Sequence, residues 1–439
     1  MIGAGLAGCE AAWQLARRGI AVELIDMKPK KLSPAHVTND FAELVCSNSL
    51  RSDDLANAVG LLKEEMRRLG SLIIRCADET RVPAGGALAV DRNRFAALVT
   101  KSIMSDSGIN VTEREVVDIP TGRIIIATGP LTADGLAGKL ASLLPDKKML
   151  SFYDSAAPIL TFESVDMEQA YFASRYSKGT ADYINCPLNA DEYKMFRAQL
   201  TGARQADVHG FEDGLVFEGC IPIEVMARRG EDTMRFGPLK PVGLPDPKTG
   251  KEPYAVVQLR KDNAEGTLYN IVGFQTHLKF PEQRRVFSMI PALQNAQFVR
   301  YGVMHRNTYL DSPKLLDRYN RLKTDTDISF AGQITGVEGY VESAASGLLT
   351  GIEVAHELKE QPYADFPQET AIGALALYIS QGAVSNFQPM NINFGLIRPP
   401  GVRVRGKRNK NLAISRRSLE IIDRIVKLDS VSTTGGFTQ

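Results

Sequence analysis

The chain has 439 residues, a length that predicts about three domains or two large ones. Hydrophobic residues make up 44% and charged residues 23%, as in a soluble globular protein rather than a fibrous or disordered one. The formal net charge of +1 neither indicates nor excludes a nucleic-acid partner, because only a local excess of charge can do so.

The sequence contains no run of 18 apolar residues and no recognisable signal peptide, so we expect no membrane partner and a cytoplasmic location. The cysteines, which are odd in number and form no C-x-x-C pair, are Cys9, Cys46, Cys76, Cys186 and Cys220. This pattern argues against a disulfide framework, a metal site and a thioredoxin-type redox pair.

The N-terminal residues predict a dinucleotide-binding loop. Gly3-Ala4-Gly5-Leu6-Ala7-Gly8 spells G-x-G-x-x-G, and an alanine-rich helix is expected at residues 8–18. The glycines permit a tight turn and close approach to a pyrophosphate, and the helix N-terminus offers unpaired N–H groups. Asp26 ends the next strand, residues 21–25, where it can accept hydrogen bonds from ribose hydroxyls.

Only Met1 and Ile2 precede this motif, whereas a strand usually has about 5–6 residues. We therefore expect the first strand to be cut short, as it would be if the chain began inside a longer protein. An incomplete strand would weaken the anchor of the glycine loop in its sheet.

A strand–helix rhythm is interrupted in the middle of the chain. Residues 123–130 predict a buried parallel strand ending in Ala-Thr-Gly-Pro, whereas residues 151–294 alternate between short runs and turns. Expected strands in this middle part are residues 156–162, 214–217, 233–236, 254–259 and 268–274. The rhythm returns near residue 328. We predict an α/β fold with residues 1–151 and 297–439 forming one discontinuous nucleotide-binding domain and 152–296 an inserted α+β domain.

A second glycine-rich stretch precedes a helix of small residues at 341–355. Gly332, Gln333 and Gly336 lie in this stretch, which could contact cofactor phosphates or a flavin edge. The alternative is that the small residues serve only tight helix packing. Asp26 suits NAD as well as FAD, but a cofactor spread over two halves of the chain favours FAD, in a glutathione-reductase-like, Rossmann-type domain.

Cys46 and Cys220 are the candidate catalytic cysteines. Cys46 opens a Ser-Asn-Ser loop, and Cys220 lies between a glycine and two carboxylates. A nucleophilic thiolate needs a neighbouring cation or a helix N-terminus, which sequence alone cannot assign. The other cysteines are expected to be buried and structural. His277 and His305 are either structural or part of a ligand site.

Two basic clusters have competing interpretations. Lys63, Arg67 and Arg68 are expected on the solvated face of a helix at residues 55–69. Residues 398–417 carry eight Lys or Arg and no acidic residue, which predicts either an RNA-binding surface or a flexible, solvated tail.

Six segments together resemble the bacterial folate- and FAD-dependent tRNA (uracil-5-)-methyltransferases. The resemblance spans essentially the whole chain and is carried by residues 2–8, 42–52, 83–92, 217–224, 301–307 and 332–342. A related flavoprotein family, which modifies the tRNA wobble uridine, shares the fold and first motif but not the whole set.

The resemblance implies an enzyme that binds FAD, reduces it with NAD(P)H and takes a carbon unit from 5,10-methylenetetrahydrofolate. The methyl group goes to C5 of a T-loop uridine in tRNA, which must leave its stack. By this resemblance Cys220 is the thiolate that adds to uracil C6, Cys46 is the general base or partner thiol, and His305 contacts the folate. Which cysteine has which role is left open, as is the oligomeric state.

Two alternatives remain from the sequence. One is a flavin enzyme that modifies a different tRNA uridine, and the other is a flavoprotein that binds RNA or a protein without methylating it. A simple NAD dehydrogenase is disfavoured, because no second intact glycine fingerprint is present. No DNA partner is expected.

Overall fold

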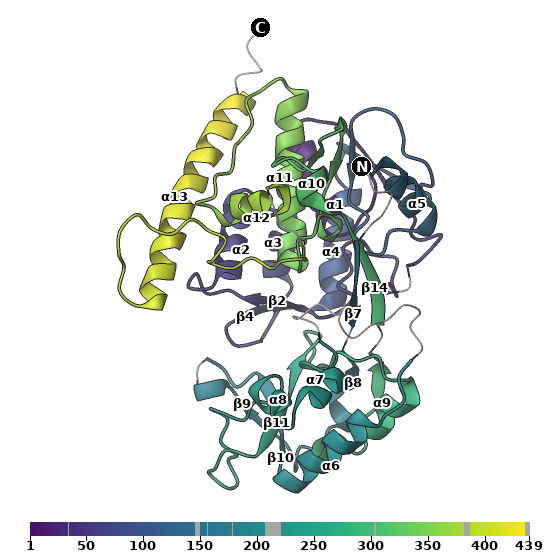
Figure 1. Cartoon of the computed structure of the whole chain (residues 1–439), viewed down its shortest axis with the longest axis vertical. Coiled ribbons are helices and arrows are strands. Elements are labelled where there is room, and N and C mark those ends of the chain that lie inside the picture. Colours follow the sequence, from purple (N-terminus) through teal and green to yellow (C-terminus); the bar gives the residue numbers. More distant parts are fainter. Residues whose placement is uncertain are drawn as a thin grey trace.

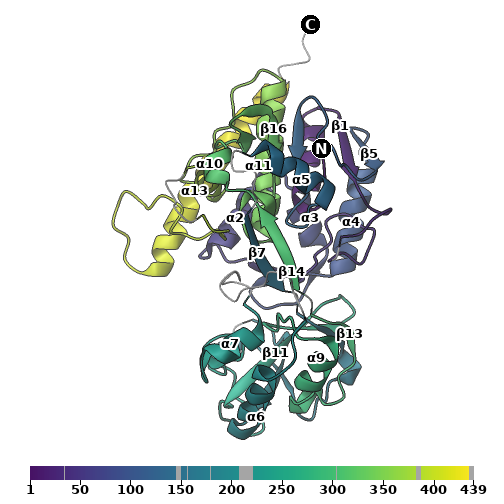
Figure 2. The ribbon, with the colours of Figure 1, turned by 45° about the vertical axis from the view of Figure 1, so that its right-hand side comes forward.

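The computed structural model describes residues 1–33, 35–144, 150–155, 157–177, 179–206, 221–302, 304–381 and 387–434. Two units lie one above the other in Figure 1, and the upper unit contains both ends of the chain. Strands β7 (Leu150–Ser155) and β14 (Met304–Tyr309) pair antiparallel and run from the upper unit to the lower one (Figure 2). The helices and the parallel strand pairs of the upper unit confirm the predicted α/β class. The domain boundaries stay predictions.

The central sheet of the upper unit is mostly parallel. Its strands are β1 (Val22–Asp26), β5 (Ile109–Glu113), β6 (Ile124–Ile126), β15 (Arg321–Leu322) and β16 (Asp325–Phe330). β1 pairs with β5 and β6 with β16 in parallel, and β15 is antiparallel to β16. Ile2 joins the two groups through parallel bridges to Ile25 and Ile126, so the N-terminus lies in the middle of the sheet.

Helices cover this sheet, and a small three-stranded sheet flanks them. The helices are α1 (Leu6–Arg17), α2 (Ala58–Arg68), α3 (Leu72–Glu79), α4 (Arg92–Met104), α5 (Asp134–Leu143), α10 (Ser312–Leu315), α11 (Tyr340–Leu358), α12 (Ala371–Ser380) and α13 (Lys407–Thr434). The small sheet contains β2 (Ser49–Ser52), β3 (Arg81–Val82) and β4 (Ala87–Val90). The first helix starts two residues earlier than predicted, and Gly19 after it has the left-handed φ of +74° expected of a helix end.

Two glycines let α11 lie directly on α1. A Cβ on Gly347 would stand 2.2 Å from the carbonyl oxygen of Ala7, and one on Gly351 would stand 2.7 Å from that of Ala11. The packing interpretation of this small-residue helix is therefore correct over these two turns. Its first turn has a different role, described below.

The lower unit is a six-stranded antiparallel sheet with its own hydrophobic core. In spatial order its strands are β13 (Phe298–Arg300), β8 (Ile159–Thr161), β12 (Leu268–Ile271), β11 (Ala255–Lys261), β10 (Tyr183–Leu188) and β9 (Tyr171–Ala173). Its helices are α6 (Ala190–Thr201), α7 (Ile223–Arg229), α8 (Thr233–Phe236) and α9 (Phe280–Phe287).

One predicted strand of the lower unit is wrong. Residues 233–236 form the short helix α8, because Gly230 and Gly237 bound a single turn whose buried side chain is Met234. The predicted strand at 214–217 lies outside the described residues.

The basic C-terminal region is a helix over much of its length, not a flexible tail. α13 buries Ile414, Leu419 and Ile422 against the upper unit, where it packs on α2. Near the end of α13, Asp429 forms an ion pair with Arg18, with an N–O distance of 2.5 Å. Within the part of the chain described, no helix is long and apolar enough to cross a lipid bilayer.

Candidate functional site

A cleft with about 1160 Å³ of empty space opens beside the glycine loop. It is lined by residues 3–7, by Asp26 and by the Ala-Thr-Gly turn after β6. Gly332, Gln333 and Tyr340 line it from the C-terminal half of the chain. The two halves predicted to share a nucleotide thus meet at one cavity.

Each glycine of the loop is required for a different steric reason. Gly3 has a φ of +98°, and a Cβ there would stand 2.6 Å from the carbonyl oxygen of Ala127. A Cβ on Gly8, which does not line the cleft, would stand 1.8 Å from the oxygen of Gly3. Gly5 has no heavy atom within 4 Å of its Cβ position, so it presents open backbone to the cleft.

Unpaired amides and one carboxylate complete this end of the cleft. The amides of Leu6 and Ala7, in the first turn of α1, donate to no described residue, and α1 lacks a side-chain cap. Asp26 accepts from the amide of Ala4 at 2.6 Å and from that of Lys28 at 2.8 Å. Each carboxylate oxygen keeps a second acceptor position, so Asp26 can still bind a hydroxyl.

The second glycine-rich stretch divides between the cleft and the core. Gly332 and Gln333 line the cleft. Gly336 does not, and its Cβ would stand 2.5 Å from the ring of Phe387, so packing accounts for this glycine.

Tyr340, the first residue of α11, connects the cleft to the Cys46 loop. Its hydroxyl accepts from the amides of Cys46 at 2.7 Å and Ser47 at 3.2 Å. Burial and the nearby Cys46 raise the pKa of Tyr340, so the phenol stays neutral at physiological pH.

Two arginines give Cys46 a cationic environment. Arg92 and Arg300 both lie close enough for the charge of Cys46 to influence their titration. Burial opposes the charge of Arg92, but Asp262, 3.0 Å away, outweighs it and raises the pKa of Arg92. Burial lowers the pKa of Arg300, which donates to the oxygen of Ala35 at 3.3 Å. Neighbouring guanidinium groups favour a thiolate.

The lower unit also anchors this loop. Arg260 of β11 donates to Asn48 Oδ1 at 3.0 Å and to Ser47 Oγ at 2.7 Å. Asn48 in turn donates to the oxygens of Val90 and Lys261, both at 2.9 Å. Cys46 therefore stands at the junction of the two units, one residue before these contacts.

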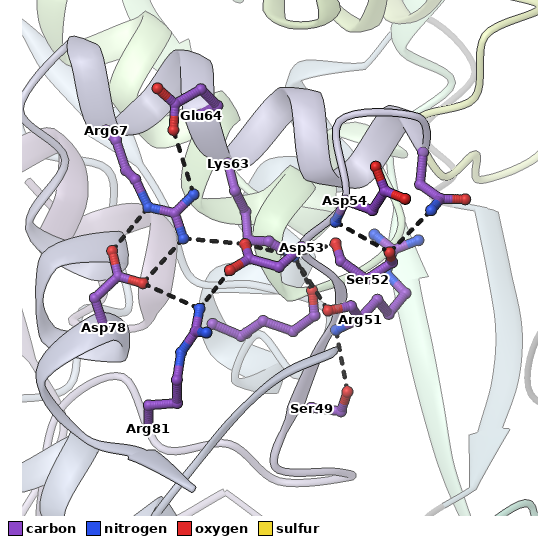
Figure 3. Close-up of polar contacts among 12 residues, drawn as sticks. Ser49, Arg51, Ser52, Asp53, Asp54, Lys63, Glu64, Arg67, Asp78 and Arg81 are labelled. Carbon is purple, nitrogen blue, oxygen red and sulfur yellow. Dashed lines mark hydrogen bonds and ion pairs between the residues drawn. The ribbon is translucent and has the colours of Figure 1, made fainter. Parts of the chain in front are cut away.

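A buried lysine supports the loop from below, which corrects the sequence prediction. Lys63 of α2 is 0% exposed, not on a solvated face. Its Nζ donates to the backbone oxygens of Leu50 (2.7 Å), Arg51 (3.2 Å) and Ser52 (2.7 Å). Figure 3 shows Lys63 beside Arg51 and Ser52. Burial lowers the pKa of Lys63 to about 8. The ammonium thus replaces water as the partner of three turn carbonyls.

The surrounding charges in Figure 3 form a network at the rim of this lysine. Asp53 lies 4.0 Å from Lys63, pairs with Arg67 at 3.0 Å, and contacts Arg81. Burial alone would raise the pKa of Asp53, but hydrogen bonds from the two arginines lower it. Arg67, on the same helix as Lys63, is consequently half-buried in ion pairs.

The structure describes the remaining predicted site residues only in part. Cys220 lies in 207–220, outside the described residues. His305 is in β14 opposite Asp154 of β7, and only its backbone is described. His277 is buried, with Nδ1 2.7 Å from Glu224, which favours a structural role. The other cysteines, Cys9, Cys76 and Cys186, are all 0% exposed, as predicted.

Comparison with known proteins decides the family. A family model described as "Glucose inhibited division protein A" matches residues 1–362. A curated protein of Acetivibrio thermocellus, "Methylenetetrahydrofolate--tRNA-(uracil-5-)-methyltransferase TrmFO", is 59% identical over 427 residues, which are 97% of this chain and 98% of that protein. TrmFO of Bacillus subtilis (strain 168) is 56% identical with the same coverage.

The chain belongs to the TrmFO family.

A solved structure shows the same fold. Aquifex aeolicus GidA superposes with a TM-score of 0.71 over 98% of this chain and 73% of that one, at 17% identity. A second crystal form gives 0.68. At this identity the likeness shows that the chain has a GidA-like fold.

Sequence reasoning missed several residues of the candidate site. Ser33, His36 and Glu43 line the cleft, and burial lowers the pKa of His36, whose Nδ1 lies 2.5 Å from Ser33 Oγ. The partners of the Cys46 loop come from positions 92, 260, 300 and 340, with no local pattern to join them. Within the described residues no cluster of His, Cys, Asp and Glu could hold a metal ion.

Proposed function

We propose that this chain transfers a carbon unit from 5,10-methylenetetrahydrofolate to C5 of a T-loop uridine in tRNA, with FAD reduced by NAD(P)H. The relatives named above are methylenetetrahydrofolate--tRNA-(uracil-5-)-methyltransferases, and they match the chain almost end to end. The observation that carries the proposal is Tyr340, which lines the nucleotide cleft and also binds the backbone of Cys46.

FAD fits the residues of the cleft. The open backbone of Gly5 and the unpaired amides of α1 suit a pyrophosphate, and Asp26 suits a ribose. Gly332 and Gln333 close the cleft from the other half of the chain, and Gly336 shapes the turn behind them. Bound FAD would supply the hydride that completes the methyl group.

The two cysteines have complementary roles. Uracil C5 is a poor nucleophile, and a thiolate adding to C6 turns the ring into an enolate that can attack the methylene carbon. We assign the thiolate to Cys220. After the C5–carbon bond forms, a base takes the C5 proton, and the bond from the transferred carbon to the folate nitrogen breaks, so that tetrahydrofolate leaves. A hydride added to the resulting exocyclic methylene completes the methyl group and expels the thiolate from C6. Cys46 is the candidate base, since its amide donates to Tyr340, which lines the cleft.

His305 is the proposed folate contact. It lies on β14, beside the paired strand β7 that joins the two units. A folate bound there would lie between the upper unit, which carries the cleft, and the lower unit. The assignment predicts that His305→Ala raises the KM for methylenetetrahydrofolate more than the KM for tRNA.

The test is thymine formation in tRNA by purified protein supplied with methylenetetrahydrofolate and NAD(P)H. We expect Cys220→Ser and Cys46→Ser each to abolish it while the yellow flavin spectrum remains. Cys76→Ser, a change at a buried cysteine of α3, is the matched control and should retain activity. Wild-type activity in Cys220→Ser would refute the mechanism.

The same assay separates the alternative functions. Methylation at a uridine outside the T-loop would favour the enzyme that modifies a different position. Flavin reduced by NAD(P)H and RNA bound, with no folate-dependent change in the RNA, would favour a binding protein.

A further inference from the structure

An aromatic ladder leads from the core of the lower unit to its surface. Buried Phe287 of α9 lies 6.4 Å from Phe298 of β13, ring to ring. Phe298 stacks on Tyr301 at 5.5 Å and 24°, and Tyr301 stacks on Phe280 at 4.9 Å and 15°. Phe280, the last ring, is 50% exposed. The ladder therefore ends in a flat ring that is supported on one side and open to solvent.

A shallow, open hollow surrounds this ring. It is lined by Phe280, Pro281, Arg284, Arg285, Ser288 and Tyr301. Arg285 is held by Glu282 at 2.7 Å and by Gln199 at 2.5 Å. Arg284 is exposed, and its guanidinium has no hydrogen bond or ion pair with any described residue. The hollow thus combines a supported aromatic face with one uncommitted cation.

The ladder is fixed in place by a buried glutamine. Gln283 of α9 is 0% exposed, donates to the oxygen of Gly302 at 2.7 Å and accepts from its amide at 2.8 Å. These two bonds clamp the residue after Tyr301 to the helix that carries Phe280. α9 and β13 lie side by side in Figure 2, near the junction of the two units. The rings are therefore preorganised for stacking.

Arg300 connects the hollow to the cleft beside Cys46. Arg300 donates to the oxygen of Ala35 at 3.3 Å, next to the cleft-lining His36, and Tyr301 follows Arg300 directly, at a Cα separation of about 3.8 Å. A nucleic-acid strand that placed one base near Cys46 would bring neighbouring nucleotides toward Phe280. Aromatic rings stack on bases, and an unpaired arginine binds the backbone phosphate.

We propose that Phe280 and Tyr301, with Arg284, form a stacking platform for an unpaired nucleotide that flanks the target uridine in the RNA substrate. The inference rests on the proposed function and adds to it the surface that holds the loop while its uridine is out of the stack. The ring supplies the base contact and Arg284 the phosphate contact.

The test uses the full-length flavoprotein and a T-arm RNA hairpin with 2-aminopurine beside the target uridine. We expect Phe280→Ala to weaken RNA binding by roughly 5- to 100-fold, because stacking on one ring carries a large share of single-strand affinity. It should also remove the fluorescence quenching that the wild-type protein causes. The melting temperature and flavin content should not change, since Phe280 is half-exposed and does not line the cleft.

Matched controls separate stacking and charge from general damage. Phe236→Ala changes a phenylalanine that is 83% exposed on α8 and should leave RNA binding unchanged. Arg284→Gln should lower the salt slope of binding by about one, whereas Arg285→Gln, already paired, should not.

Unchanged RNA affinity and quenching in Phe280→Ala would overturn the platform. It would also be overturned if Phe280→Ala impaired the binding of a protein partner but not of RNA. Failure of wild-type protein to form thymine, with quenching intact, would instead count against the proposed function.

Discussion

The hydroxyl of Tyr340 accepts a hydrogen bond from the backbone amide of Cys46 at 2.7 Å. The two residues are 294 positions apart, and Tyr340 also lines the nucleotide cleft. One side chain thus sets the position of the cysteine relative to the cavity.

Tyr340→Phe removes this acceptor and leaves two loop amides unpaired. We expect the kcat for thymine formation to fall by about 10- to 100-fold with little change in the KM for tRNA, because misplacing a reacting group is costly. Tyr378→Phe is the control and should keep kcat, because this change on α12 removes only a hydroxyl that donates to the backbone oxygen of Gln388. A normal kcat in Tyr340→Phe would show that the loop holds its shape without the phenol.

Gly5→Ala and Gly347→Ala add the same methyl group in opposite situations. The first meets open space at a φ of −76°, so the apoprotein should keep its melting temperature while flavin affinity drops by roughly tenfold. The second meets the oxygen of Ala7 at 2.2 Å and should cost about 1–3 kcal/mol of unfolding free energy or more. Urea unfolding and flavin titration measure the two effects. Equal loss of stability in both variants would contradict this assignment.

Glu65 gives the fold a defined pH dependence. It is 0% exposed and accepts from the amides of Ala371 (2.7 Å) and Ile372 (3.0 Å), and burial raises its pKa to about 7. The folded state therefore holds the proton more tightly than the unfolded one. Its stabilisation, about 3 kcal/mol, is complete below pH 4.5 and is lost as the pH rises to about 7.

Glu65→Gln should remove this dependence. The difference in unfolding free energy between wild type and variant should fall with pH between about 4.5 and 7 and then stay constant. Glu420→Gln, at an exposed position of α13, is the control. If this difference rose over the same pH range, the pKa of Glu65 would be lowered by folding, which would contradict the prediction.

Lys63→Met tests the lysine beneath the Cys46 loop. Methionine fills similar space but cannot donate to the oxygens of Leu50, Arg51 and Ser52, so we expect a loss of about 2–4 kcal/mol. Arg68→Met, a change on the same helix at a half-exposed ion pair, should cost less than about 1 kcal/mol. If Lys63→Met and Arg68→Met lost similar amounts of unfolding free energy in denaturant, water would be replacing the ammonium as the partner of the three carbonyls.

The start of α13 and the segment before it test the RNA-binding interpretation of the basic region. Arg403, Arg405, Lys407 and Lys410 are exposed and have no described ion-pair partner, so we expect their joint replacement by Gln to weaken tRNA binding. The salt slope should fall by about one for each phosphate that is no longer neutralised. Arg398→Gln, at a residue already paired with Glu369 at 2.9 Å, should have little effect. An unchanged slope would remove this region from the RNA surface.

Local patterns predicted the glycine loop and the helix after it, whereas the binding of a nucleotide by this loop stays a prediction. The spacing of Gly3, Gly5 and Gly8 encodes steric demands that the loop meets within its own neighbourhood. The same holds for the first helix and the buried strand before Ala127. These features depend on contacts that a short motif specifies.

The Cys46 environment could not be predicted in this way. Its amide, cationic and loop partners are Tyr340, Arg92, Arg300 and Arg260, which are far from Cys46 in the sequence and come from both units. The error over Lys63 has the same origin. Helical spacing placed it on a polar face, but the turn that it supports belongs to another element whose carbonyls needed a donor.

Helix α11 sets the distance between the Cys46 loop and the glycine loop. At one end Tyr340 holds the Cys46 loop, and seven residues later Gly347 rests on the backbone of the nucleotide loop at Ala7. With a rise of about 1.5 Å per residue, the helix separates these two points by about 10 Å. A larger side chain anywhere along the α1–α11 contact would therefore change the distance between the glycine loop and the Cys46 loop, even if that side chain contacts neither loop.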